Sequence, residues 1–265
     1  MKPIKLEIMI AAGVLILSAL ACNLGSQAPT EVTQPQEGSS TEPAPQQDQS
    51  SSNSSADACD NPYSPIVQGA TWNYNMTGGV ADTFVHSIVS IEADGFTEQD
   101  VFGTGITRTG YWSCDNGALT MLDPSSDTTG TVATDKVTAD FKTTSASGIT
   151  LPATINPNDT WEQAITLEGT EDIGGNQIPA KNEFSNSCKA IGVESVTVPA
   201  GTFDAMRVDC QTNMNITITM ANTPVTTPLT FTTSSWFAEN VGLVKETKTG
   251  TGVDSVIELT TYNIP

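Results

Sequence analysis

The stretch VTVPAGTFDAMRVDCQTNMNITITM, residues 196–220, decides the fold of this chain. From Phe203 onward its side chains alternate between apolar and polar, and successive side chains of a β-strand point to opposite faces of a sheet. The apolar side chains that share one parity are Met206, Val208, Cys210, Met214, Ile216, Ile218 and Met220. A long strand with one buried face predicts a large, curved antiparallel sheet whose other face is wet.

A turn precedes this strand. Pro199 fixes its own φ and has no N–H to donate, and Gly201 tolerates a positive φ. The pair predicts a hairpin whose arms are residues 189–198 and 203–220.

The rest of the folded region, residues 58–265, contains frequent Gly, Thr and Val, and turn signals recur at short intervals. No stretch shows a helical period beside these short runs, so the sequence predicts an antiparallel all-β domain. The other predicted strands are residues 70–76, 83–91, 106–113, 118–122, 160–168, 229–237, 243–247 and 253–262.

The first 21 residues have the pattern of an export signal. Lys2 and Lys5 precede an apolar run over residues 8–21, and small residues follow at its end. A positive end, a short apolar core and small residues before a cut site are typical of a signal peptide. The run is too short for a membrane span, which needs about 20 apolar residues.

The end of this signal, LSALAC at residues 17–22, resembles the lipobox of bacterial lipoprotein precursors. It departs from the pattern at Ala19, where Leu is usual. The resemblance implies that Cys22 receives diacylglycerol and becomes the first residue after cleavage, so that acyl chains hold the protein stably at a membrane. The alternative is an ordinary secretory signal followed by an incidental cysteine.

Residues 22–57 form the predicted linker. After the cysteine the stretch is rich in Gln, Ser, Pro, Glu and Thr and holds no aromatic residue, Lys or Arg. Such a segment buries too little apolar surface to offset the entropy of ordering, so we expect a disordered tether between the lipid and the domain.

Four further cysteines, Cys59, Cys114, Cys188 and Cys210, predict disulfides, because an exported chain with an even number of cysteines oxidises them in pairs. Three pairings are open. The hairpin favours Cys188 with Cys210, with a bulge near Gly192 absorbing an offset of about three residues between the arms. Cys59 then pairs with Cys114 by elimination. A zinc site is the alternative, although the usual close cysteine pairs are missing.

Charge and composition exclude several functions. The net charge is −20, with 10 basic residues in all, which argues against nucleic-acid partners because phosphate contacts need clustered Lys and Arg. His86 is the one histidine, and we expect it on the sheet surface rather than in a catalytic triad. The acidic loops, such as Asn156 to Asp159, lack the EF-hand spacing and are expected to be solvated. No catalytic residue, metal or cofactor is predicted.

Three stretches together resemble the TapB-like group of uncharacterised β-rich bacterial lipoproteins. They are PIVQGATWNY at 65–74, VTVPAGTFDAMRVDC at 196–210 and SSWFAENVGLVKE at 234–246. The resemblance implies a curved antiparallel sheet akin to the half-barrels of periplasmic lipoprotein carriers, and it implies no established activity.

The apolar stripe of residues 206–220 has two interpretations. It faces a packed core with Phe231, Ile257 and Leu259, or it lines a groove for a lipid or other apolar ligand, where flexible Met side chains adapt to irregular shapes. We therefore expect a membrane-anchored, extracytoplasmic, non-enzymatic binding or structural module, with any apolar ligand on the concave face of the sheet. The alternatives are an envelope hydrolase that uses carboxylates and a surface adhesion or assembly protein. The sequence names no protein partner.

Replacing Cys22 with Ala should release the protein from the membrane fraction of its host, because the acyl chains would have no attachment site. Fractionation followed by immunoblotting measures this. Retention of the Cys22→Ala protein in the membrane fraction would show that the anchor lies elsewhere.

Overall fold

A computed structural model describes residues 58–79, 81–123, 131–133, 137–173, 176–220, 223–250 and 254–265. All of them belong to one unit of the chain, Ser54–Pro265. The predicted signal peptide, Cys22 and the linker to residue 57 lie outside the described residues, so lipidation stays a prediction. Within the described ranges, no helix has the length and apolar character that a membrane crossing demands.

The described domain is built from β-strands. They are β1 (Thr71–Gly78), β2 (Asp82–Ile91), β3 (Gly95–Phe102), β4 (Thr107–Asp115), β5 (Ala118–Asp123), β6 (Thr131–Ala133), β7 (Val137–Gly148), β8 (Thr160–Ile173), β9 (Asn176–Val198), β10 (Gly201–Met220), β11 (Thr223–Ala238), β12 (Gly242–Gly250) and β13 (Ser255–Asn263).

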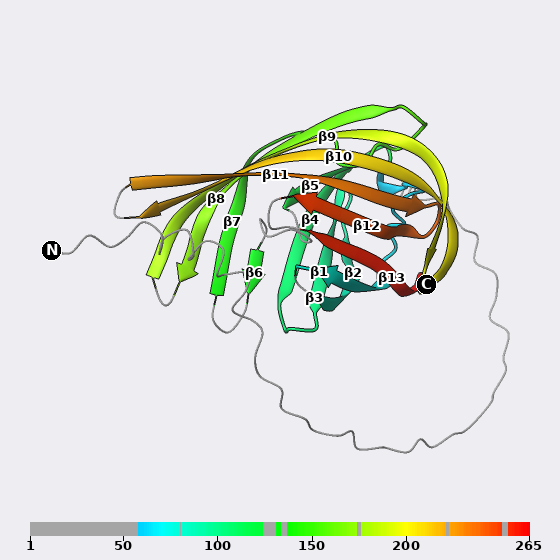
Figure 1. Cartoon of the computed structure of the whole chain (residues 1–265), viewed down its shortest axis with the longest axis horizontal. Helices are drawn as coiled ribbons and strands as arrows, with labels where there is room; N and C mark the ends of the chain where they lie inside the picture. Colours follow the sequence, from blue (N-terminus) through cyan, green and yellow to red (C-terminus); the bar gives the residue numbers. More distant parts are fainter. Residues whose placement is uncertain are drawn as a thin grey trace, which may run out of the picture. The chain divides into compact units, whose positions relative to one another are not determined.

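All of these strands belong to one antiparallel sheet, in the order β3-β2-β1-β13-β12-β11-β10-β9-β8-β7-β6-β4-β5. An additional pairing of β3 with β4 brings the two ends of this order together, so the sheet is a nearly closed, barrel-like ring. The longest strands, β9, β10 and β11, run side by side and curve along one flank of it (Figure 1). The all-β, curved antiparallel prediction is confirmed, and the sheet closes further than a half-barrel.

The β9–β10 hairpin is the longest ladder in the sheet, and it turns at Pro199 and Ala200, as the motif predicts. β10 begins at Gly201, two residues earlier than expected, so the arms differ by one residue rather than about three. One bulge absorbs that residue: Arg207 faces Gly192 and Val208 faces Ala190. Gly192 has a φ of 152°, a conformation that glycine adopts readily.

The inward face of β10 follows the predicted parity for most of its length. Met206, Val208 and Met214 are buried, whereas Ile216 and Ile218 are half-buried and Met220 is 39% exposed. Ile218 packs against a second, smaller core around Phe141, separate from the main core that holds Met206 and Val208. The stripe therefore runs from the main core past this second cluster to the tip of a hairpin.

Three strands and half of a fourth have no counterpart among the predicted ones: β3, β6, β7 and the first part of β9, residues 176–188. In β3 the inward side chains include Glu98 and Asp100, and in β9 they include Asn182 and Asn186. Polar residues at inward positions erase the apolar alternation by which a strand is recognised from sequence.

One edge of β11 has no neighbouring strand among the described residues. β12 pairs with β11 from Phe231 onward, which leaves Thr223–Thr230 paired only with β10. Pro224 and Pro228 lie in that free half. Proline has no N–H to offer to a foreign strand, so the two residues protect the edge against unwanted pairing.

Two disulfides fasten the domain. Cys188 is joined to Cys210 across the β9–β10 ladder, where the two residues are register partners, and Cys59 is joined to Cys114 at the end of β4. Next to Cys59, the Asn61 side-chain amide donates to the carbonyl oxygens of Gly117 (2.7 Å) and Pro152 (3.0 Å). The residues before β1 are thereby tied to the rest of the fold.

Removing the Cys59–Cys114 bridge should destabilise the domain more than removing Cys188–Cys210. The first bridge closes a loop whose ends are 55 residues apart in the sequence, and the second a loop whose ends are 22 residues apart. From the entropy of loop closure we expect losses of about 4 and about 3 kcal/mol for the paired Cys→Ala variants. Urea unfolding monitored by circular dichroism gives both values. The reverse order would show that the bridge acts through native-state packing instead.

Candidate functional site

The interior of the ring holds a cavity of about 270 Å³. Aromatic rings dominate the part of its wall that β1 to β4 and β8 provide: Trp72, Tyr74, Phe84, Phe96, Trp112 and Trp161. Because protein interiors are otherwise close-packed, a space of this size inside the sheet needs a physical explanation.

Hydrogen bonds and stacking hold the aromatic rings in place. Trp72 Nε1 donates to the Val241 carbonyl (2.6 Å) and Trp161 Nε1 to the Thr150 carbonyl (2.9 Å). Tyr74 stacks on Phe84 with ring centres 4.9 Å apart. Rings fixed at their polar ends cannot swing inward, so the wall keeps its shape around the empty space.

The Tyr74 hydroxyl is not placed to act as an acid or a base. It donates to the Leu243 carbonyl at 2.8 Å. Burial, followed by the charge of Asp100, raises the pKa of Tyr74 well above its ordinary value of 10.0, so the group stays a neutral phenol.

Three ionisable side chains meet on the wall formed by β2 and β3. His86 Nδ1 lies 2.8 Å from Asp100 Oδ1, and His86 Nε2 lies 3.7 Å from Glu98 Oε2. The register explains the meeting, because His86 faces Asp100 directly across the β2–β3 ladder and Glu98 is two residues along on the same face. Asp100 is fully buried and Glu98 is 5% exposed.

The acids decide the charge of His86. Burial alone lowers its pKa, but the hydrogen bond that His86 donates to Asp100 and the charges of Glu98 and Asp100 outweigh burial and raise the pKa to about 9. His86 is therefore an imidazolium at neutral pH, with both ring nitrogens acting as donors. The expectation that His86 lies on the outer surface is wrong: its strand presents Phe84, His86 and Ile88 to the interior, and all three line the cavity.

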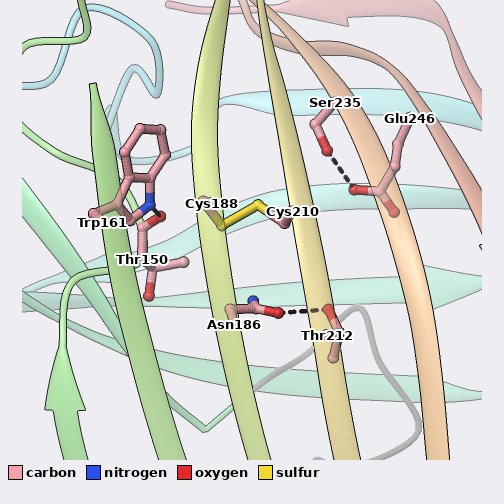
Figure 2. The surroundings of a disulfide bond; sticks show 8 residues. All are labelled: Thr150, Trp161, Asn186, Cys188, Cys210, Thr212, Ser235 and Glu246. Carbon is pink, nitrogen blue, oxygen red and sulfur yellow. Dashed lines mark hydrogen bonds between the residues drawn. A yellow bond between two sulfur atoms is a disulfide. The ribbon is translucent and has the colours of Figure 1, made fainter. Parts of the chain in front are cut away.

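Another part of the wall comes from β9 to β12, shown around the disulfide in Figure 2. Cys188 and Cys210 line the cavity, and Thr212 donates to Asn186 Oδ1 on the same pair of strands. On the next pair, Ser235 donates to Glu246 Oε2 at 3.0 Å. The polar atoms of this wall thus satisfy one another across neighbouring strands.

Two polar atoms of cavity-lining residues are buried without a hydrogen-bond partner among the described residues. They are Asp100 Oδ2, an acceptor, and Trp112 Nε1, a donor. A buried polar group without a partner costs about 1–3 kcal/mol, and more when it is charged. Both residues line the cavity, although the two atoms themselves are buried.

The His86 cluster lacks the geometry of a catalytic centre. A histidine that activates a serine offers one nitrogen to the serine and the other to an acid, whereas both nitrogens of His86 face acids. The imidazole also occupies the space between Glu98 and Asp100, where a pair of hydrolytic carboxylates would hold substrate. No group of three or more His, Cys, Asp and Glu within the described ranges could hold a metal ion.

The structure brings together some of the residues singled out from the sequence. Val208 of the apolar stripe and the Cys188–Cys210 disulfide line the cavity, whereas Met206 and Met214 are buried without lining it. The acidic loop at Asn156 is closed on itself, because Asp159 accepts from its backbone N–H at 2.7 Å. Glu98 and Asp100 were not among the residues predicted from the sequence, and their signal is the period-two pattern Phe96-Glu98-Asp100-Phe102.

The fold and the cavity define the class of protein: an all-β domain whose barrel-like sheet encloses an aromatic-lined chamber. The chain belongs to the DUF3108-like family, whose sequence profile matches residues 89–250. No curated protein matches the sequence.

Two solved structures share the fold. A candidate exported protein with a YmcC-like fold from Bacteroides fragilis is 16% identical, with a TM-score of 0.50 over 77% of this chain and 100% of that one. A candidate lipoprotein from Parabacteroides distasonis is 18% identical, with a TM-score of 0.52 over 77% of this chain and 99% of that one. The hypothetical lipoprotein YmcC from Escherichia coli aligns at 10% identity and a TM-score of 0.35, over 73% of this chain and 84% of that one.

The raised pKa of His86 predicts a pH-dependent stability. The folded state holds a proton that the unfolded state releases near pH 6.5, so the free energy of unfolding should fall between pH 6.5 and about 9, by roughly 3 kcal/mol at most. Urea unfolding across this range measures the loss, and the His86→Gln variant should lack this component.

The pKa of His86 can also be measured directly. Because the chain has 1 histidine, its imidazole signal in an NMR titration belongs to His86 without further assignment. A midpoint at or below 6.5 in the folded protein would contradict the ion cluster.

Proposed function

We propose that this chain is an extracytoplasmic lipoprotein, anchored through Cys22, whose domain binds a small, mainly apolar molecule inside the ring. The observation that carries the proposal is the aromatic-lined cavity of about 270 Å³. An engineered cavity of roughly 150 Å³ in another protein binds benzene, so this space accommodates a larger molecule. The ligand would occupy the interior of the sheet, which is its concave side.

The walls favour binding over structural packing as the role of this space. A cavity with no use is costly, because its lining loses dispersion contacts that a filled core would have. Here the lining rings are instead fixed in place by hydrogen bonds from Trp72, Tyr74 and Trp161. Preformed apolar sites of this kind bind without the cost of reorganising the protein.

Three observations support the extracytoplasmic location. The first is the predicted signal peptide with the lipobox-like cysteine at its end. The second is the pair of disulfides, which persist in oxidising compartments. The third is that the solved relatives carry descriptions as exported or lipoprotein candidates. The narrower resemblance to the TapB-like group stays a prediction.

The rival functions fit less well. A hydrolase needs carboxylates with access to substrate and water, and the two that converge here are engaged with His86. An adhesion or assembly protein predicts a filled interior and an exposed apolar patch. The aromatic-lined cavity in the interior therefore favours a binding protein.

Binding can be tested with Nile red, a neutral dye whose fluorescence rises in apolar surroundings. The protein should enhance its fluorescence, and Thr233→Trp should remove the enhancement, because Thr233 lines the cavity and an indole there would fill it. The matched control is Thr232→Trp. Thr232 is the preceding residue of β11, is exposed and points to the other face, so this variant should bind the dye like the original protein.

Native mass spectrometry of the protein isolated from its host envelope complements the dye. A co-purifying small molecule on the original protein and on Thr232→Trp, absent from Thr233→Trp, would support the proposal. Equal dye binding by all three proteins would refute the interior site, provided that circular dichroism shows each variant folded.

A further inference from the structure

Asp100 keeps one carboxylate oxygen without a hydrogen-bond partner among the described residues in the wall of the cavity. Its side chain is fully buried, and Oδ1 lies 2.8 Å from His86 Nδ1. Within the described part of the chain, no group donates a hydrogen bond to Oδ2, although Asp100 lines the cavity. A buried carboxylate oxygen is a strong acceptor, and leaving it without a donor is unfavourable.

An anion in the cavity could accept from the unpartnered Trp112 Nε1, but both cations of the lining already contact other lining groups. Its charged lining consists of the carboxylates Glu98, Asp100 and Glu246 and the cations His86 and Lys248. His86 is already held between two of these acids. The Lys248 ammonium lies over the ring of Phe231, 4.8 Å from its centre.

Arg108 does not change this balance inside the cavity. It is the register partner of Asp100, but its guanidinium lies over the ring of Phe102, 4.7 Å from the centre. Arg108 is not among the described residues that line the cavity. A ligand in the chamber therefore meets more carboxylates than cations.

We propose that the ligand is a primary amine on an apolar body, whose ammonium group donates a hydrogen bond to Asp100 Oδ2 while its body fills the aromatic part of the chamber. This inference rests on the proposed function and names the chemical class of that ligand. An ammonium supplies the missing donor, and aromatic ring faces attract cations. A fatty acid would instead bring a fourth carboxylate beside Asp100, Glu98 and Glu246. Any lining cation that paired with it would be shared with one of these acids or with an aromatic ring.

The test compares three ligands that share one apolar body: octylamine, octanol and octanoate. Isothermal titration calorimetry is performed at neutral pH on the full chain carrying Cys22→Ala, which should need no detergent. We expect octylamine to bind at least about tenfold more tightly than octanoate, with octanol between them.

Two matched variants locate the headgroup. Asp100→Asn keeps the shape of the side chain and removes its charge, and should weaken octylamine about tenfold while changing octanol little. Glu246→Gln is the control: Glu246 also lines the cavity, but its Oε2 already accepts from Ser235. This variant should change octylamine binding by less than about threefold.

The outcomes separate this inference from the function on which it rests. If octanoate binds as tightly as octylamine, the proposal of an amine ligand is wrong, although the cavity still binds apolar molecules. The same holds if octanol binds as tightly as octylamine, because solvent would then satisfy Asp100. Equal effects of the two variants would also overturn the role of Asp100. If none of the three ligands binds, both proposals fail. The ranking on the parent protein decides the question even if Asp100→Asn does not fold.

Discussion

The hydrogen-bonded pairing of β3 with β4 is the constraint on which the rest of the structure depends. It runs from Gly95 opposite Ser113 to Val101 opposite Thr107 and joins the two ends of an otherwise open sheet. A closed sheet has an inside, and every inward side chain of its strands must then fill that inside or surround a space. The aromatic chamber, the buried acids and the cavity-lining disulfide all follow from this closure.

The elements that could be predicted from the sequence are those whose inward positions are apolar. β10 shows its strand character through Met206, Val208 and Met214, and its turn through Pro199 and Gly201. The position of Cys188 opposite Cys210 then follows from counting residues along the hairpin, because a ladder fixes which residues meet. The register also required a bulge, and the structure places it beside Gly192.

The polar side chains that line the cavity are also what kept this site from being predicted from the sequence. β3 carries Glu98 and Asp100 where a packed core would have apolar side chains, so its pattern resembles that of an exposed, irregular segment. The same substitution of polar for apolar residues hides the first half of β9, where Asn182 and Asn186 face inward. Only the ladder between β2 and β3 shows that the acids of one strand neutralise the histidine of the other.

The pairing of β1 with β13 has a consequence for how the molecule assembles. Thr71 lies opposite Asn263, so the first strand of the ring finds one of its two neighbours at the far end of the polypeptide. The ring cannot be completed until nearly the whole domain has been made, and such long-range pairings form slowly because the chain must close a large loop first. Until then β1 and β12 each present an unpaired edge, and this interval is the one in which neighbouring copies are most prone to associate.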